Sequence, residues 1–113
     1  MPKRTKPEPK PRQNTKSKQD AKKYLGTVPQ EVTFWCIDGR IFKNIQELGE
    51  GLVTMSDETF AGHCNQEKCD FSNWVRDVIG DQKLARDLAK VKSKVEAAKA
   101  VSDRIATLNK RLA

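Results

Sequence analysis

The first 23 residues limit most strongly what this chain can fold into, because they contain almost nothing that a core could bury. Before Tyr24 the only apolar side chains are those of Met1 and Ala21, and four of the five prolines lie between residues 2 and 11. Ordering a backbone costs about 1–2 kcal/mol per residue, and so polar a segment has no burial to offset that cost. The sequence predicts a disordered basic tail and junction over residues 1–29 and one small domain over residues 30–113.

The same segment carries all of the excess positive charge. The chain has 22 Lys and Arg against 15 Asp and Glu, for a formal net charge of +7, and only two of the acids, Glu8 and Asp20, precede Tyr24. Nine cations precede Tyr24: Lys3, Arg4, Lys6, Lys10, Arg12, Lys16, Lys18, Lys22 and Lys23. Cations interleaved with proline and polar residues are typical of arms that bind phosphate backbones. We predict binding to DNA or RNA, largely independent of base sequence, with a solubilising tail without a partner as the alternative.

After the tail, the pattern predicts a hairpin followed by helices. Residues 31–37 are rich in β-branched and aromatic side chains, Asp38-Gly39 favours a two-residue type I′ turn, and residues 40–43 return as the second strand. Apolar periodicity predicts helices over about 45–54, 57–63, 71–79, 82–91 and 94–111, the last two being one long helix in the alternative. The predicted N-caps are Asn44, Ser56, Asp70, Asp81 and Ser93. The fold class is therefore α+β, mostly helical, with an N-terminal β-hairpin packed on four to five short helices.

One block of the sequence resembles a known family. The run His63…Cys69-Asp70-Phe71-Ser72-Asn73-Trp74-Val75-Arg76-Asp77-Val78-Ile79-Gly80-Asp81…Leu84-Ala85 resembles a small domain family of unknown function, found mainly in archaea and some bacteria. The resemblance covers about residues 32–110 and leaves the basic tail outside. It implies a single fold unit and no particular activity. The chain departs from the family pattern at Cys64, usually apolar, and at Cys69, usually Asn, so a role tied to that Asn does not carry over.

A metal site is the second chemical hypothesis. Cys36, His63, Cys64 and Cys69 are four ligands of the kind that structural zinc uses, but adjacent His and Cys rarely bind one tetrahedral ion. We therefore predict no metal and no cofactor, and keep a zinc- or thiol-dependent site around residues 63–69 as an alternative. An odd number of cysteines and no secretion signal argue against a disulfide framework, and predict a cytoplasmic protein with the nucleoid as one location.

The remaining patterns favour a non-enzymatic protein. His63 lies near several acids, which suits either acid–base chemistry or a bond to Asp70 that orders the loop, and no phosphate loop or dinucleotide fingerprint is present. Alternation places Phe34 and Trp35 on opposite faces of their strand, and Trp74 is expected to be buried. No apolar run is long enough to span a membrane.

The C-terminal region suggests two further surfaces. Its cations form a second basic set: Lys90, Lys92, Lys94, Lys99, Arg104, Lys110 and Arg111. Residues 91–112 are also amphipathic, which supports a protein-interaction module, through a homo-oligomer or another protein partner, as the alternative function.

Overall fold

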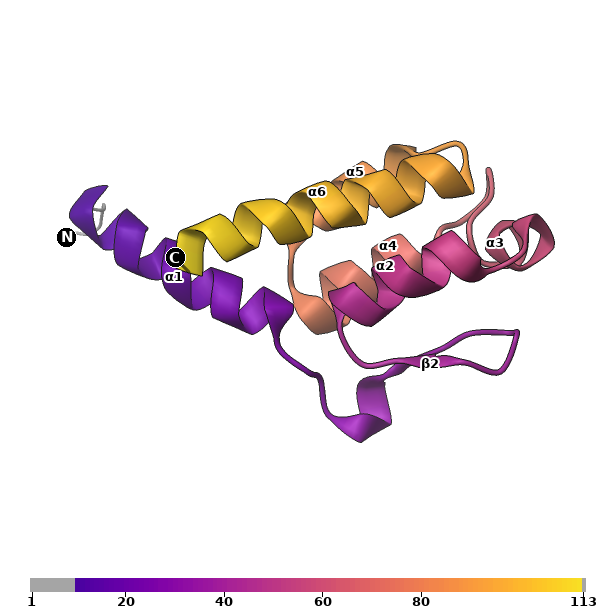
Figure 1. Cartoon of the computed structure of the whole chain (residues 1–113), viewed down its shortest axis with the longest axis horizontal. Helices are drawn as coiled ribbons and strands as arrows, with labels where there is room; N and C mark the ends of the chain where they lie inside the picture. Colours follow the sequence, from indigo (N-terminus) through magenta and orange to yellow (C-terminus); the bar gives the residue numbers. More distant parts are fainter. Residues whose placement is uncertain (1–9, 113) are drawn as a thin grey trace, which may run out of the picture.

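The computed structural model describes the backbone of residues 10–112 and the side chains of residues 18–112. The elements in chain order are α1 (Lys10–Leu25), the 3₁₀ turn η1 (Gln30–Val32), β1 (Phe34–Trp35), β2 (Ile41–Phe42), α2 (Ile45–Thr54), α3 (Asp57–His63), α4 (Asp70–Trp74), the π-helical turn η2 (Val75–Ile79), α5 (Gln82–Lys90) and α6 (Lys94–Leu112). The predicted fold class is confirmed. The described chain is mostly helical, and a two-stranded antiparallel hairpin precedes helices α2 to α6. Figure 1 shows α6 lying across the molecule, with the hairpin on the opposite side of α2.

The hairpin is shorter than predicted, and its turn is of another type. Only Phe34↔Phe42 and Trp35↔Ile41 pair as strands. The amide of Cys36 donates to the carbonyl of Arg40, leaving three residues in the loop, and the last of them, Gly39, has a positive φ of 98°. This is the three-residue arrangement that ends on a left-handed glycine, rather than the two-residue type I′ turn.

The inner face of the hairpin packs on the helices through aromatic rings. The ring of Phe34 lies 5.1 Å from that of Phe71 and 5.8 Å from that of Trp74, measured between centroids. Trp74 is buried, as predicted, and donates its Nε1–H to the carbonyl of Val32 at 2.8 Å. Phe42 lies directly over Gly51 of α2, where a β-carbon would overlap its ring, so glycine is required there although it weakens the helix.

Side-chain caps define the starts of four helices, as predicted. Asn44, Ser56 and Asp81 each accept a hydrogen bond from the amide three residues on, at the starts of α2, α3 and α5. Ser93 does the same for Glu96, and the carboxylate of Glu96 accepts from the amide of Lys92. Ser93 thus caps α6 while Glu96 bonds back to the residue before the cap, and this explains why residues 82–112 form two helices rather than one.

The third predicted helix differs at its start. Asp70 is the first residue of α4 rather than its cap, because its carboxylate bonds to His63 and Lys68 instead of to backbone amides. Gly80 ends this segment in the left-handed conformation, with φ 90°, as predicted.

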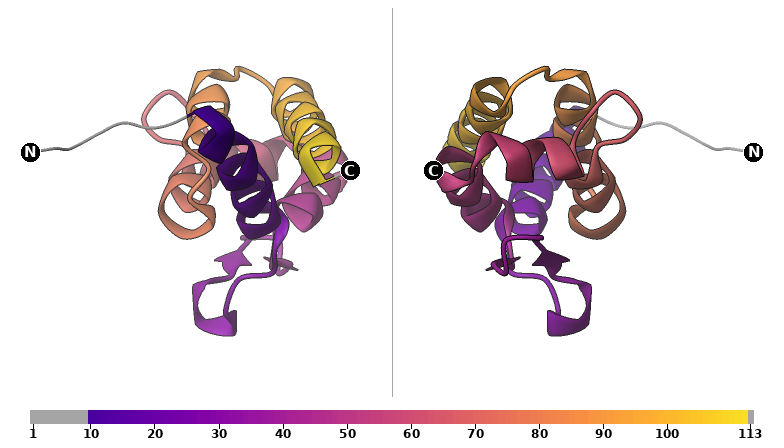
Figure 2. Two further views of the ribbon diagram at one scale, coloured as in Figure 1. Left: turned by 90° about the vertical axis from the view of Figure 1, so that its left-hand side faces the viewer. Right: turned by 90° about the vertical axis from the view of Figure 1, so that its right-hand side faces the viewer.

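The largest difference from the prediction lies at the N-terminus. Residues 10–23, which were expected to belong to the disordered tail, are part of the helix α1, which runs beside α6 (Figures 1 and 2). The correction has a physical reason: Ala21, Tyr24 and Leu25 share one helix face, and that face packs on the core, with Ala21 fully buried. The tail before Lys10 lies outside the described residues. Among residues 10–112, no helix combines the length and apolar character needed to cross a bilayer.

Candidate nucleic-acid interface

The predicted phosphate-binding cations lie mostly on α1. This helix contains six of the nine, against a single acid, Asp20. Lys18, Lys22 and Lys23 are described with their side chains and are exposed. Lys10, Arg12 and Lys16 lie where the backbone alone is described, and Lys3, Arg4 and Lys6 lie outside the described residues. The backbone positions of the six cations therefore span roughly 20 Å of the helix, at about 1.5 Å per residue.

A small apolar stripe and the cation of Arg104 fix α1 on the core. Ala21 has no exposed surface, and the guanidinium of Arg104 lies 6.0 Å from the centre of the Tyr24 ring. The ammonium of Lys23 lies beside Gly80, 3.2 Å from the place that a β-carbon there would occupy.

Beneath α1 lies a buried ion pair that the sequence analysis missed. The guanidinium of Arg104 donates to both carboxylate oxygens of Asp81, at 2.7 and 3.1 Å, and Asp81 also caps α5. Arg104 is 7% exposed and Asp81 1%. Arg104 had been counted among the surface cations of the last helix, and this assignment was wrong, because its charge is neutralised inside the molecule. The same site raises the pKa of Tyr24, through burial and the nearby charges of Asp20 and Asp81.

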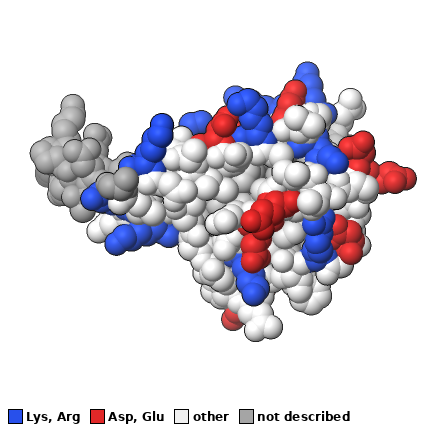
Figure 3. Space-filling view, in the orientation of Figure 1, with Lys and Arg blue, Asp and Glu red and all other residues white. Residues whose placement is uncertain are grey.

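The surface cations differ in how far other groups of the chain engage them. On the body of the molecule, Lys94 donates to the carbonyl of Met55 at 2.6 Å, and Lys83 and Lys99 form ion pairs with Asp87 and Asp103. Four other exposed cations of the body have no ion pair in the described chain: Lys43, Arg86, Lys90 and Lys92. At the end where α1 meets the last turn of α6, Lys18, Lys22, Lys23 and Lys110 are exposed, Arg111 is half-buried, and none of them forms an ion pair within the described part of the chain. In Figure 3 the side chains over this end are mainly blue, while blue and red ones are mixed over the rest of this face. We call these five cations the basic end.

The four candidate metal ligands are arranged for other contacts. Cys64 and Cys69 form a disulfide across the loop between α3 and α4, and Cys36 is a buried free thiol. The argument against a disulfide was therefore wrong for this pair, which the short loop brings to a Cα–Cα distance of 3.9 Å. Within the described residues, no group of three or more His, Cys, Asp or Glu is placed to hold a metal ion.

His63 has both ring nitrogens engaged. Its Nε2 accepts the amide hydrogen of Ile37 at 3.0 Å, so the proton of the neutral ring lies on Nδ1, which donates to Asp70 at 3.0 Å. Burial alone would raise the pKa of Asp70, but hydrogen bonds from His63 and Lys68 outweigh it and hold this pKa below its ordinary value. The predicted bond between His63 and Asp70 is confirmed, and the ring joins the hairpin to the loop rather than offering a free base.

The amphipathic face of the last helix is used largely within the chain. Ala97, Val101 and Leu108 are buried in the core and Ile105 packs against it, while Val95 remains 74% exposed.

Comparisons of the chain with protein-family models, with curated proteins and with solved structures found no match.

Proposed function

We propose that this protein binds the phosphate backbone of DNA or RNA through α1 and the adjoining end of α6. The observation that carries the proposal is the basic end: exposed cations on a helix with one acid, without ion-pair partners in the described chain. A cation that is not engaged by a carboxylate keeps its charge for a phosphate, and each contact adds to affinity by releasing counterions. Such binding depends little on base sequence, since phosphates carry no sequence information.

The test is a salt-dependent titration of the full chain with a DNA duplex and an RNA of equal length. The variant Lys18→Gln, Lys22→Gln, Lys23→Gln removes three cations without touching the buried face of α1. We expect weaker binding and a log–log salt slope shallower by up to about 2.7, at roughly 0.9 per lost phosphate contact on duplex DNA. Deleting the tail to Lys23 is a poorer test, because it removes Ala21 from the core.

A matched control lowers the net charge by the same amount elsewhere. Lys83→Gln, Lys90→Gln, Lys99→Gln changes three exposed lysines of α5 and α6, two of which are already paired with acids. We expect most of the wild-type affinity to remain in this variant. Equal losses of affinity in the two triple variants would show that only the overall charge matters, and would contradict a defined interface. Binding that does not depend on salt concentration would contradict the proposal altogether.

A further inference from the structure

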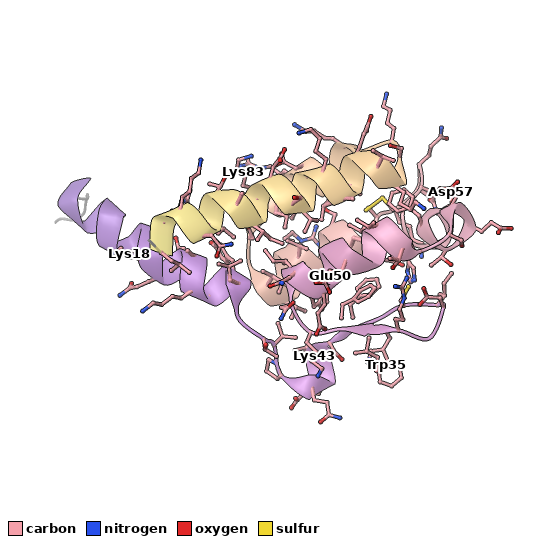
Figure 4. All side chains as sticks on the ribbon, in the orientation of Figure 1. Lys18, Trp35, Lys43, Glu50, Asp57 and Lys83 are labelled. Atoms are coloured by element: carbon pink, nitrogen blue, oxygen red, sulfur yellow. A yellow bond between two sulfur atoms is a disulfide. The ribbon has the colours of Figure 1, made fainter. Side chains whose placement is uncertain are left out.

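The outer face of the hairpin exposes an aromatic ring that the fold does not use. Trp35 is 74% exposed and its cross-strand partner Ile41 is 47% exposed, while the neighbouring pair Phe34 and Phe42 is buried on the inner face. Figure 4 shows Trp35 and Lys43 projecting from the hairpin on the side away from α2. Adjacent exposed apolar side chains such as this pair mark interaction surfaces, whereas a single exposed residue does not.

Hydrogen bonds hold this ring in place and leave its faces uncommitted. The indole Nε1–H of Trp35 donates to the hydroxyl of Thr33 at 3.1 Å, and that hydroxyl donates to the carbonyl of Gln30 at 3.0 Å. The only polar atom of the indole is therefore satisfied within the chain. What remains for a ligand is the π surface, already oriented, so little side-chain entropy is lost on binding.

A hollow of about 480 Å³ opens beside the ring. Trp35, Ile41 and Lys43 line it together with neutral residues, and its lining within the described chain has no carboxylate. An aromatic ring, an aliphatic floor and one cation match a nucleotide, which has a planar apolar base and an anionic phosphate.

The hollow lies next to the C-terminal end of α1. Thr27 and Val28, which also line it, follow α1 within three residues, and the amide of Val28 donates to the carbonyl of Lys43 at 2.9 Å. A strand whose phosphates lie along α1 meets Trp35 if it continues past the C-terminal end of that helix. This arrangement favours a nucleic-acid ligand over an apolar peptide, for which the cations of α1 would have no use.

We infer that Trp35 stacks on a base of single-stranded nucleic acid while Lys43 faces the adjoining phosphate. The inference rests on the proposed function and deepens it, because it names the strand state of the ligand. Bases in a duplex are stacked on one another and offer no free face to the ring, whereas unpaired bases do.

The experiment compares two oligomers of equal length and charge, about ten nucleotides long to match a typical single-strand site. One is oligothymidylate and the other is an abasic deoxyribose-phosphate chain. We expect the full-length protein to bind oligothymidylate roughly fivefold to a hundredfold more tightly than the abasic chain, the range that one stacked base supplies. Trp35→Ala should bind the two oligomers with equal affinity. Trp35→Phe, which keeps a π face, should retain part of the preference for oligothymidylate.

Two controls separate this inference from the backbone proposal. Val95→Ala, a change at an equally exposed apolar residue of α6, should leave the ratio unchanged. The triple α1 variant should weaken binding of both oligomers and keep their ratio. Equal affinity of the wild type for the two oligomers overturns stacking while leaving backbone binding intact, and failure of both oligomers to bind overturns both proposals.

Discussion

The two ends of the molecule are joined to the core by polar contacts of opposite kinds. Under α1, Asp81 and Arg104 form an ion pair whose side chains are 1% and 7% exposed. Under the hairpin, His63 is almost as buried, but its partner Asp70 is 32% exposed and shares its carboxylate with the exposed Lys68. The first contact is sealed from water and the second remains open to it. Breaking the buried (sealed) pair is expected to destabilise the fold strongly. In the partly exposed (open) pair, by contrast, the carboxylate can be protonated from the solvent.

Breaking the sealed pair gives the largest expected effect. Arg104→Ala leaves the carboxylate of Asp81 buried without its partner, and also removes the cation over Tyr24. Losing one partner of a buried pair costs about 3–5 kcal/mol, a large share of the 5–15 kcal/mol by which domains are stable. Urea denaturation measures it. Lys110→Ala, an exposed change on the same helix, should stay within about 0.5 kcal/mol of wild type, and an equally small loss for Arg104→Ala would contradict the comparison.

Opening the disulfide should have an intermediate effect. Cys64 and Cys69 are separated by five positions, and closing so short a loop is worth at most about 2 kcal/mol in the chain-entropy account. The bond from the amide of Asn65 to the carbonyl of Lys68 still closes the loop after reduction. We expect the reduced protein to remain folded with a modestly lower melting temperature. The double variant Cys64→Ser, Cys69→Ser should not respond to reductant, and unfolding on reduction would show that this end depends on the crosslink.

Lowering the pH should produce the smallest change in stability, through the partly exposed carboxylate of Asp70 under the hairpin. Because the folded-state pKa of Asp70 is depressed, its contribution to stability is complete above its unfolded pKa and is lost as the pH falls through the folded value. Asp70→Asn should therefore be less stable than wild type at neutral pH and should approach it in acid. Glu67→Gln, an exposed change in the same loop, should run parallel to wild type. Melting temperatures measured between neutral pH and pH 3 test this prediction. A difference in melting temperature between Asp70→Asn and wild type that does not change with pH would contradict the contribution of the ionised Asp70 to stability.

Local signals allowed much of the fold to be predicted from the sequence. Asn44, Ser56, Asp81 and Ser93 lie where helices begin, and the bonds that give them this preference involve residues only three positions away. The opposite faces of Phe34 and Trp35 also followed from strand alternation. Whether Trp35 or its neighbour faced solvent depended on what the hairpin packs against, which alternation does not determine.

The failures concern contacts between distant residues. The stripe that holds α1 consists of Ala21, Tyr24 and Leu25, too few to mark a helix in so polar a segment until α6 is known to lie beside it. Gly26 follows the stripe directly, and glycine is typical of the position just after a helix end. Arg104 looked like any other cation of its helix, since nothing local reveals that Asp81, 23 positions earlier, meets it inside the molecule.

The narrow stripe on α1 has a consequence for how this protein can diverge. Because Ala21 is the one fully buried residue among the described side chains of α1, most of its outward positions can be substituted with little effect on packing. Natural variation could therefore raise, lower or reposition the charge of this surface while the fold stays constant. Among related sequences, we expect positions 18, 22 and 23 to vary in identity far more than positions 21, 81 and 104.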